Sequence, residues 1–216
     1  MYRLFIFDFD GTLVDTAPDI VYYTNVVLKE FGYPEKSFDE VRKAVGKGVH
    51  ELLRSLGFQE DPETLDKAVC LLKERYLESP VRTTSVYPHV REMLSGPLRG
   101  AKKAVVTNKL QTLTEKILNQ LSMRDHFDLV IGDGGGFPCK PDPASVRHVL
   151  ETLQVQPFEA LFIGDSEVDF KTAGNAGVDF IFMEYGYDKF FKEENVKRFF
   201  SASEWGRLAS LNGRVR

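Results

Sequence analysis

Short, continuous runs of hydrophobic residues recur along the chain and are separated by segments with helical periodicity. The runs lie at residues 4–7, 104–106, 129–131, 161–163 and 180–183. Because they do not alternate with polar residues, they are typical of strands buried on both faces of a parallel sheet. Between them, hydrophobic residues such as Leu113, Ile117 and Leu121 recur every four positions, which predicts amphipathic helices. This order predicts an α/β fold with a doubly wound, Rossmann-like parallel sheet.

One long segment near the start of the chain breaks this alternation. Residues 15–84 contain helical patterns, such as the face shared by Ile20 and Tyr23, and no convincing strand. We therefore expect a core formed by residues 1–14 and 85–216. The helical segment, residues 15–84, is expected to form a small lobe over the sheet, inserted after the first strand.

Three local patterns carry further expectations. Thr16, followed three residues later by Asp19, predicts a capping box at the start of the first helix of this segment. The charged stretch at residues 189–198 is interpreted as the solvated face of a helix. The glycine-rich stretch at residues 132–136 lacks the known phosphate-loop patterns and is interpreted as a flexible connection.

The composition limits the classes of function. The 216 residues include 28 Lys and Arg against 32 Asp and Glu, a net charge of −4, so there is no overall basic footprint for nucleic acid. No hydrophobic run approaches the ~18 residues of a membrane helix, and the two cysteines form no disulfide or zinc pattern. We expect a cytoplasmic monomer or homodimer that binds neither nucleic acid nor membrane.

Acidic side chains follow two of the predicted strands. Asp8 and Asp10 come directly after the first strand, and Asp165 and Asp169 follow the fourth. In an open α/β sheet, ligands bind outside the carboxyl ends of the strands. The four carboxylates are therefore expected to converge at one edge of the sheet.

Three further polar residues belong to the same edge and indicate the chemistry. Thr107 and Asn108 follow the second strand, and Lys140 lies in a proline-flanked loop. This set suits phosphoryl transfer, in which catalysis is mostly positioning and charge stabilisation. Clustered carboxylates repel an anionic substrate unless a hard cation such as Mg²⁺ bridges them. One carboxylate can then act as nucleophile, and a second can transfer the proton.

The ordered motifs resemble those of the haloacid dehalogenase-like superfamily of aspartate-nucleophile phosphotransferases. They are Asp8-Phe9-Asp10-Gly11-Thr12, Thr107, Lys140 and Gly164-Asp165-Ser166 with Asp169. The resemblance covers nearly the whole chain, since the helical segment corresponds to the family's cap. Within the superfamily, the opening motif and the loop Gly46-Lys47-Gly48 are most similar to the phosphoglycolate phosphatase-type branch.

This resemblance implies a role for each matching residue of the core. Asp8 would be the nucleophile and a metal ligand, and Asp10 the general acid and base, with its backbone carbonyl on the metal. Thr107 would bind a phosphoryl oxygen, with Asn108 beside it. Lys140 would offset the charge of Asp8 and of the phosphoryl group.

The remaining expected site residues concern the metal and the substrate. Asp165 would ligate Mg²⁺, and Asp169 would position the waters of the metal. Gly46 and Lys47, in the cap loop, are expected to contact the substrate, because a lysine between glycines can reach a carboxylate.

We therefore expect a Mg²⁺-dependent phosphatase that hydrolyses a small phosphomonoester through an aspartyl-phosphate, with 2-phosphoglycolate as the best candidate. A sugar-phosphate mutase similar to β-phosphoglucomutase remains an alternative, because both classes share Asp8 and Asp10; a pyrophosphatase is a further one. Dehalogenation is disfavoured because the dehalogenases of the superfamily lack the second acid. A catalytically silent module is disfavoured because every expected catalytic position is filled.

Overall fold

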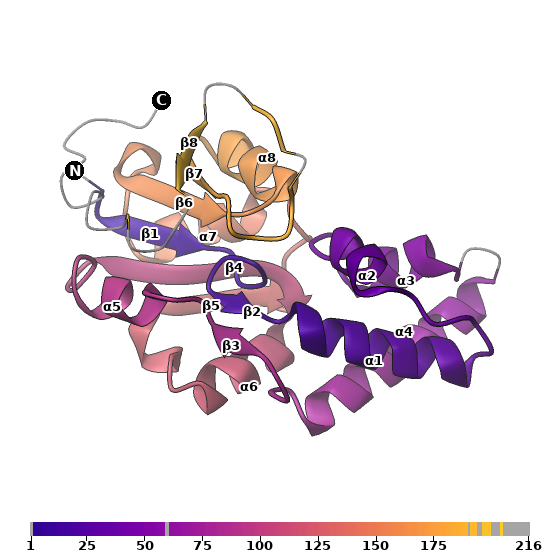
Figure 1. The fold of residues 1–216 in the computed structure, drawn as a ribbon. Coiled ribbons are helices and arrows are strands. Elements are labelled where there is room, and N and C mark those ends of the chain that lie inside the picture. Colours follow the sequence, from indigo (N-terminus) through magenta and orange to yellow (C-terminus); the bar gives the residue numbers. More distant parts are fainter. Residues whose placement is uncertain (1, 59–60, 190, 194–195, 200–203, 205–216) are drawn as a thin grey trace.

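A six-stranded parallel sheet lies at the centre of the computed structural model, which describes residues 2–58, 61–189, 191–193, 196–199 and 204 (Figure 1). Its strands are, in spatial order, β5 Leu129–Asp133, β4 Lys102–Leu110, β1 Leu4–Phe7, β6 Ala160–Gly164, β7 Asp179–Met183 and β8 Lys197–Phe199. Every pair of neighbours is parallel. The predicted α/β fold with a Rossmann-like sheet is confirmed.

The sheet is covered by helices on both faces. Because successive side chains of a strand point to opposite faces, Phe5 and Phe7 of β1 enter one hydrophobic cluster, and Leu4 and Ile6 enter the other. The first cluster is completed by α5 Val90–Ser95 and α6 Gln111–Gln120, the second by α7 Ala144–Thr152 and α8 Glu167–Ala176. This two-sided burial explains why the strand sequences are continuously hydrophobic.

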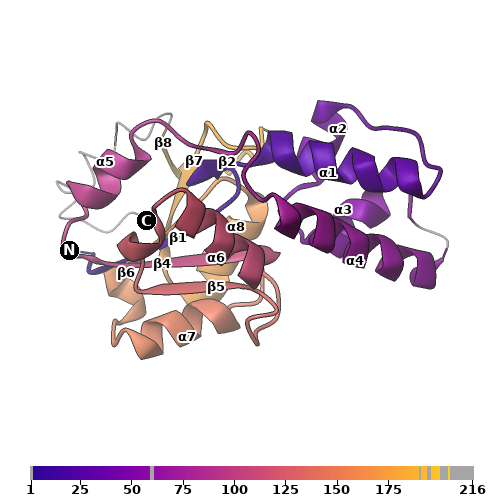
Figure 2. The ribbon, with the colours of Figure 1, turned by 90° about the horizontal axis from the view of Figure 1, so that it is seen from below.

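Four more helices lie beyond the carboxyl ends of the strands (Figures 1 and 2). They are α1 Ala17–Glu30, α2 Phe38–Ala44, α3 Val49–Leu56 and α4 Pro62–Glu78. The chain enters and leaves this group through a short antiparallel pair, β2 Val14–Asp15 with β3 Ser85–Val86. That residues 15–84 form a separate cap domain stays a prediction. In the part of the chain that the structure describes, no helix is long and apolar enough to cross a bilayer.

The capping box predicted at the start of α1 is wrong. Thr16 occupies the N-cap position, but its side chain caps nothing and its hydroxyl donates to Asp10 Oδ1 at 2.5 Å. The Asp19 carboxylate instead accepts hydrogen bonds from residues 82–84, just before β3. Thr16 therefore binds an acidic residue of the turn after β1, and Asp19 joins the start of α1 to a segment 63–65 residues later in the chain.

The helix expected at residues 189–198 is also wrong for the described end of that stretch. Lys197–Phe199 forms β8, which pairs in parallel with Ile181–Met183 of β7. Phe199 is buried in the hydrophobic cluster of one sheet face. This short edge strand keeps charged side chains at the border of the sheet, a common feature of edge strands.

Candidate active site

The first strand delivers Asp8 to the carboxyl edge of the sheet. The Asp8 backbone N–H donates to the Ile163 carbonyl at 2.9 Å, which continues the pairing of β1 with β6 past the end of β1. Gly11 follows with a φ of +83°, and a Cβ at this position would lie 2.3 Å from Asp165 Oδ2. Only glycine tolerates both conditions. The turn after β1 therefore packs directly against the end of β6.

Three carboxylates converge at this edge and form the acid cluster: Asp8, Asp165 and Asp169. One oxygen from each lies within 4.8 Å of the others, and all three residues are buried. Lys140 joins two of them, since its Nζ donates to Asp8 Oδ1 at 2.7 Å and to Asp169 Oδ1 at 2.6 Å. Residues from three distant parts of the sequence thus share one site.

Neighbouring groups fix the orientation of two carboxylates in the acid cluster. Asp165 accepts the Thr12 hydroxyl at 3.0 Å on one oxygen and the Tyr187 backbone N–H at 2.6 Å on the other. Asp169 Oδ2 accepts both the backbone N–H and the hydroxyl of Ser166, at 3.1 and 2.6 Å. Because Lys140 binds its other oxygen, the Asp169 carboxylate is held in one orientation.

The acid cluster carries more negative charge than Lys140 neutralises. Burial, together with the charge of Asp169, raises the pKa of Asp8 from 3.8 to about 7, although Lys140 partly offsets this. Burial and the charges of Asp8 and Asp169 also raise the pKa of Asp165 well above its usual value. Burial alone would lower the pKa of Lys140, but the charges of Asp169 and Asp8 outweigh it and raise that pKa.

These shifts predict an unusual pH dependence of stability. In EDTA, the free energy of unfolding is expected to fall as the pH rises from about 4 to about 7, by a few kcal/mol at most. Asp8 and Asp165 hold their protons more tightly in the folded chain than in the unfolded one, so their stabilising contribution is complete below pH ~3.8 and is lost as the pH rises through the folded pKa. Asp19, whose pKa is lowered, contributes the opposite slope only near its unfolded pKa of 3.8, at the acidic limit of this window.

The measurement is urea unfolding in EDTA at several pH values between about 4.5 and 7, repeated with excess Mg²⁺. We expect Mg²⁺ to remove most of the decline and Asp8→Asn to flatten it in EDTA. His126, whose pKa is lowered, contributes the opposite slope near pH 6.5 and is common to both proteins. An identical slope in the wild type and Asp8→Asn would contradict the assignment to Asp8.

Asp10 lies beside the acid cluster and is held by two other side chains. Its Oδ1 accepts the Thr16 hydroxyl, and both of its oxygens accept from Lys109 Nζ, at 3.1 and 3.3 Å. The Lys109 side chain is only 5% exposed, and its ammonium also reaches the hydroxyl and ring of Tyr76 in α4. No role was predicted for Lys109 from the sequence, although its place as the third consecutive polar residue toward the end of β4 was the available signal.

Thr107 and Asn108 lie at the carboxyl end of β4, and both are buried. Asn108 Nδ2 donates to the carbonyls of Gly46 and Lys140, at 2.9 and 3.0 Å, while its Oδ1 accepts the Lys140 N–H at 2.7 Å. Asn108 therefore connects the loop that carries Lys140 to the loop after α2. Direct contact of Thr107, Asn108 or Gly46 with a substrate stays a prediction.

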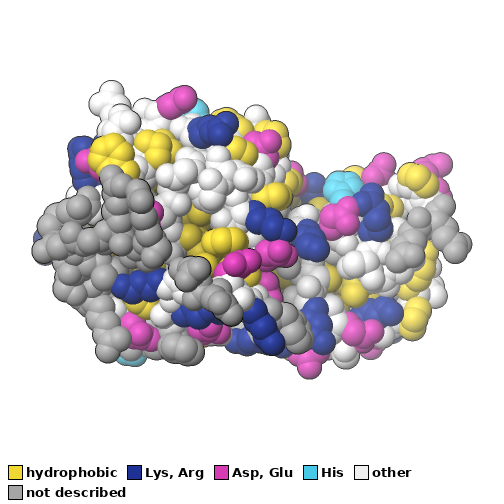
Figure 3. Space-filling view, turned by 90° about the horizontal axis from the view of Figure 1, so that it is seen from above, with side chains coloured by type: hydrophobic (Ala, Val, Ile, Leu, Met, Phe, Trp, Pro, Cys, Tyr) yellow, Lys and Arg dark blue, Asp and Glu magenta, His cyan; other side chains and the backbone are white. Residues whose placement is uncertain are grey.

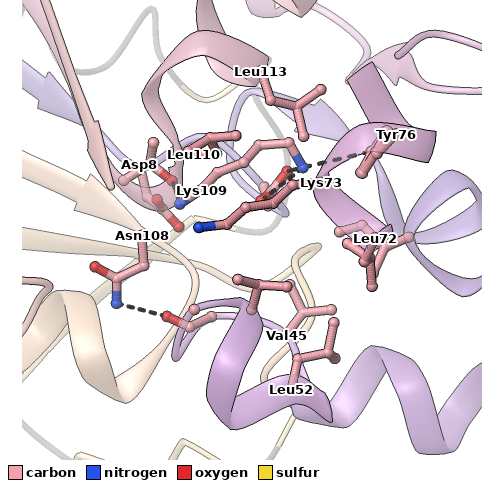
Figure 4. Close-up of a pocket in the computed structure, with 16 residues that line it drawn as sticks. Asp8, Val45, Leu52, Leu72, Lys73, Tyr76, Asn108, Lys109, Leu110 and Leu113 are labelled. Atoms are coloured by element: carbon pink, nitrogen blue, oxygen red, sulfur yellow. Dashed lines mark hydrogen bonds and ion pairs between the residues drawn. The ribbon is translucent and has the colours of Figure 1, made fainter. Parts of the chain in front are cut away.

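Two cavities are lined by Asp8 and Asp10, and Val45 and Gly46 contribute to the wall of both. The β4–α4 cavity, about 690 Å³ and open to solvent, is lined among others by Thr107, Asn108, Lys109 and by Lys73 of α4 (Figure 4). The α2–α8 cavity, about 850 Å³, is lined among others by Lys47 and by the start of α8.

The cavities lie where the two lobes of the molecule meet. Seen from above, the molecule narrows between the sheet and the group formed by α1–α4, and charged side chains of both signs gather there (Figure 3). Lys47 is exposed. Asp133, at the end of β5, pairs with Lys73 at 3.5 Å and does not belong to the acid cluster.

Comparison with known proteins identifies relatives of the whole chain. A phosphoglycolate phosphatase of Aquifex aeolicus (strain VF5) is 37% identical over 191 residues, which cover 87% of this chain and 87% of that protein. A phosphoglycolate phosphatase of Rhodobacter capsulatus is 40% identical over 191 residues, covering 85% of each. A crystal structure described as that of a predicted phosphoglycolate phosphatase from Haemophilus somnus 129pt matches with a TM-score of 0.87 and 26% identity, covering 96% of this chain and 97% of that one.

The fold, the site and these relatives define the chain as a phosphoric monoester hydrolase, whose substrate is a phosphorylated small molecule. The family model described as haloacid dehalogenase-like hydrolase matches residues 5–183. The chain belongs to the haloacid dehalogenase-like hydrolase family, as its motifs predicted, and its relatives lie in the phosphoglycolate phosphatase branch. Phosphatases of this family generally use a divalent metal ion, and the acid cluster contains suitable oxygen ligands.

Proposed function

We propose that this phosphatase hydrolyses 2-phosphoglycolate with Mg²⁺ as its cofactor and an aspartyl-phosphate on Asp8 as the intermediate. The observation that carries the proposal is the buried acid cluster of Asp8, Asp165 and Asp169, bridged by Lys140. A buried carboxylate beside a lysine and two further acids suits a nucleophile whose charge must be balanced before an anionic phosphoryl group approaches.

The side chains of the acid cluster fit a hard divalent cation. They offer carboxylate oxygens within 4.8 Å of one another, and the raised pKa values of Asp8 and Asp165 reflect the mutual repulsion that a cation would relieve. Asp8, Asp165 and the backbone carbonyl of Asp10 would hold the ion, and Asp169 would position its waters. When bound, Mg²⁺ supplies positive charge that stabilises the negative charge of the transferring phosphoryl group.

The first chemical step transfers the phosphoryl group to Asp8. An oxygen of the Asp8 carboxylate attacks phosphorus, and the bond from phosphorus to the ester oxygen breaks as Asp10 donates its proton to that oxygen. Lys140, 2.7 Å from Asp8, balances the charge. Thr107, at the end of β4, would donate its hydroxyl to a phosphoryl oxygen. The products of this step are the free alcohol and the aspartyl-phosphate.

The second step returns the enzyme to its starting state. Asp10, now ionised, takes a proton from a water molecule, whose oxygen attacks the phosphorus of the aspartyl-phosphate. The bond between Asp8 and phosphorus breaks, and inorganic phosphate leaves. Lys109 and Thr16, which hydrogen-bond the Asp10 carboxylate, would hold it in place for both proton transfers.

The choice of 2-phosphoglycolate rests on the relatives and on the charges above the site. Proteins that are 37% and 40% identical to this chain are phosphoglycolate phosphatases. Gly46, through its carbonyl, is tied to Asn108 at the carboxyl end of β4, so the loop carrying Lys47 lies next to the proposed phosphoryl site. Lys47, in this loop and in the wall of the α2–α8 cavity, is proposed to contact the substrate beside its phosphoryl group.

The test is phosphate release from a panel of phosphomonoesters that includes 2-phosphoglycolate, sugar phosphates and nucleotides, with pyrophosphate beside them. We expect 2-phosphoglycolate to be hydrolysed with a kcat/KM at least about 10-fold above the others, a selectivity of ~1.4 kcal/mol. EDTA should abolish release, and added Mg²⁺ should restore it, because the acid cluster cannot accept an anionic substrate uncompensated. Isomerisation of a sugar phosphate without phosphate release would favour a mutase instead.

A further inference from the structure

The two cavities above Asp8 differ in what they offer a substrate. The β4–α4 cavity contains Thr107 and Asn108, beside the proposed phosphoryl site. The α2–α8 cavity contains neither of them; it is lined by the proposed metal ligand Asp165 and by charged residues of both signs, among them Arg42, Lys43, Lys47 and Glu167. A substrate whose phosphoryl group binds beside Thr107 and Asn108 therefore extends into the β4–α4 cavity.

Two lysines are found among the residues that line the β4–α4 cavity, and they differ in their state. Lys109 is almost fully buried and its ammonium binds both oxygens of Asp10, so its positive charge is already paired. Lys73 projects from α4 into the cavity, on the side of Asp8 and Asn108 (Figure 4). Its ammonium pairs with Asp133 at 3.5 Å, with both side chains about a third exposed, at 28% and 32%.

The ion pair between Lys73 and Asp133 is weak enough for another anion to replace Asp133. Partly exposed ion pairs at such a distance are weakened by water and contribute little to stability. The cavity around Lys73 is otherwise largely apolar, with Leu72, Leu52 and Leu113 in its wall. A substrate that fills this cavity would exclude water, and a charged group on it would then interact more strongly with Lys73 than Asp133 does in the open site.

We propose that Lys73 determines substrate specificity by binding the anionic group at the end of the substrate opposite the phosphate, and that this group displaces Asp133. The inference rests on the proposed function, since the anionic group of 2-phosphoglycolate is its carboxylate. Lys73 binds the leaving group of the substrate and takes no part in the bond changes at phosphorus. Asp133 acts as a competitor that excludes substrates too weakly charged to replace it.

The test compares 2-phosphoglycolate with 2-hydroxyethyl phosphate, which has the same length and a neutral end. In Lys73→Met, kcat/KM for 2-phosphoglycolate is expected to fall about 10- to 100-fold, mainly through KM, as for loss of a charged hydrogen bond. The value for the neutral ester should change by less than about 3-fold. Lys73→Arg should restore most of the selectivity. Lys67→Met is the matched control, because Lys67 is an exposed lysine of the same helix that pairs with Glu63.

Substitution of Asp133, the ion-pair partner of Lys73, is expected to change kcat/KM in the opposite direction. Asp133→Asn should raise kcat/KM for 2-phosphoglycolate about 2- to 5-fold, since Lys73 loses its competitor and one repulsive charge is removed. A merely structural ion pair would instead make both substitutions harmful on both substrates, and that result would overturn the proposal. Selective loss in Lys47→Ala with none in Lys73→Met would also overturn it, by placing the carboxylate in the α2–α8 cavity.

The substrate preference of the wild-type protein distinguishes an error in the role of Lys73 from an error in the proposed substrate. If the wild type prefers 2-phosphoglycolate and Lys73→Met keeps that preference, only the assignment of Lys73 fails. If the wild type hydrolyses phosphomonoesters without preferring the charged one, the proposed substrate fails, and the role of Lys73 fails with it.

Discussion

Asp8→Asn is expected to abolish turnover, with kcat reduced at least about 1000-fold. The amide oxygen can still accept the hydrogen bond from Lys140 Nζ, but it cannot attack phosphorus as a carboxylate does. Because the substitution removes a buried charge whose burial is unfavourable, the protein should remain folded and at least as stable as the wild type in EDTA.

Phosphate release and a urea unfolding curve, measured on the same preparation, separate loss of chemistry from loss of fold. Acid quenching during turnover should trap phosphate on the peptide that contains Asp8 in the wild type and not in the variant. Asp39→Asn provides a matched control, since this side chain lies on α2 with 70% exposure. Retention of more than a few per cent of activity in Asp8→Asn would rule out Asp8 as the nucleophile.

Asp19→Ala is expected to lower the free energy of unfolding by about 3–5 kcal/mol. Asp19 is 1% exposed, and its carboxylate accepts the backbone N–H groups of Arg82, Thr83 and Thr84 together with the hydroxyls of both threonines. Burial alone would raise its pKa, but these hydrogen bonds outweigh burial and lower it. Alanine would leave the two buried donors of Thr84 and the partly buried donors of Arg82 and Thr83 without this acceptor, next to the strand pair that joins α1–α4 to the sheet.

Urea unfolding at neutral pH measures this loss, and Asp19→Asn should show a smaller one because its amide oxygen keeps some of the hydrogen bonds. Asp61→Ala is a useful comparison. Asp61 caps α4 at the exposed surface by accepting the N–H groups of Glu63 and Thr64, so its replacement by alanine should lower the free energy of unfolding clearly less than Asp19→Ala. If Asp19→Ala cost no more than Asp61→Ala, Asp19 would be an ordinary helix-end residue.

The strands of the sheet were predictable because burial on both faces leaves a direct trace in the sequence. All five hydrophobic runs lie in strands. The predicted ends agree with the observed strand ends to within two residues, except for β4, which extends from Lys102 to Leu110. β8 was missed because an edge strand is only partly buried, so that its sequence, Lys197–Phe199, carries two charges in three residues. Hydrophobic periodicity reports burial, and it is least informative where burial is incomplete.

The acid cluster was predictable for a topological reason. Parallel strands present their carboxyl ends at one edge, and β1 lies between β4 and β6 in the sheet. The residues that follow these strands therefore lie close together, whatever the positions of the helices that connect the strands. Asp8, Asp165 and Asp169 with Lys140 could be placed together from strand positions and the order of the motifs alone.

The contacts between α1–α4 and the sheet were not predictable in this way. Thr16 and Asp19 carry the spacing of a helix cap, yet one hydroxyl binds Asp10 and one carboxylate binds residues 82–84. Lys109 binds Asp10 across 99 residues, and Lys73 pairs with Asp133 across the junction of the two lobes. Strand order and the convergence of acids follow from patterns along the chain, because they depend on regular backbone geometry. The partners of these polar side chains depend on how the helical group is seated above the sheet, and no local pattern encodes that placement.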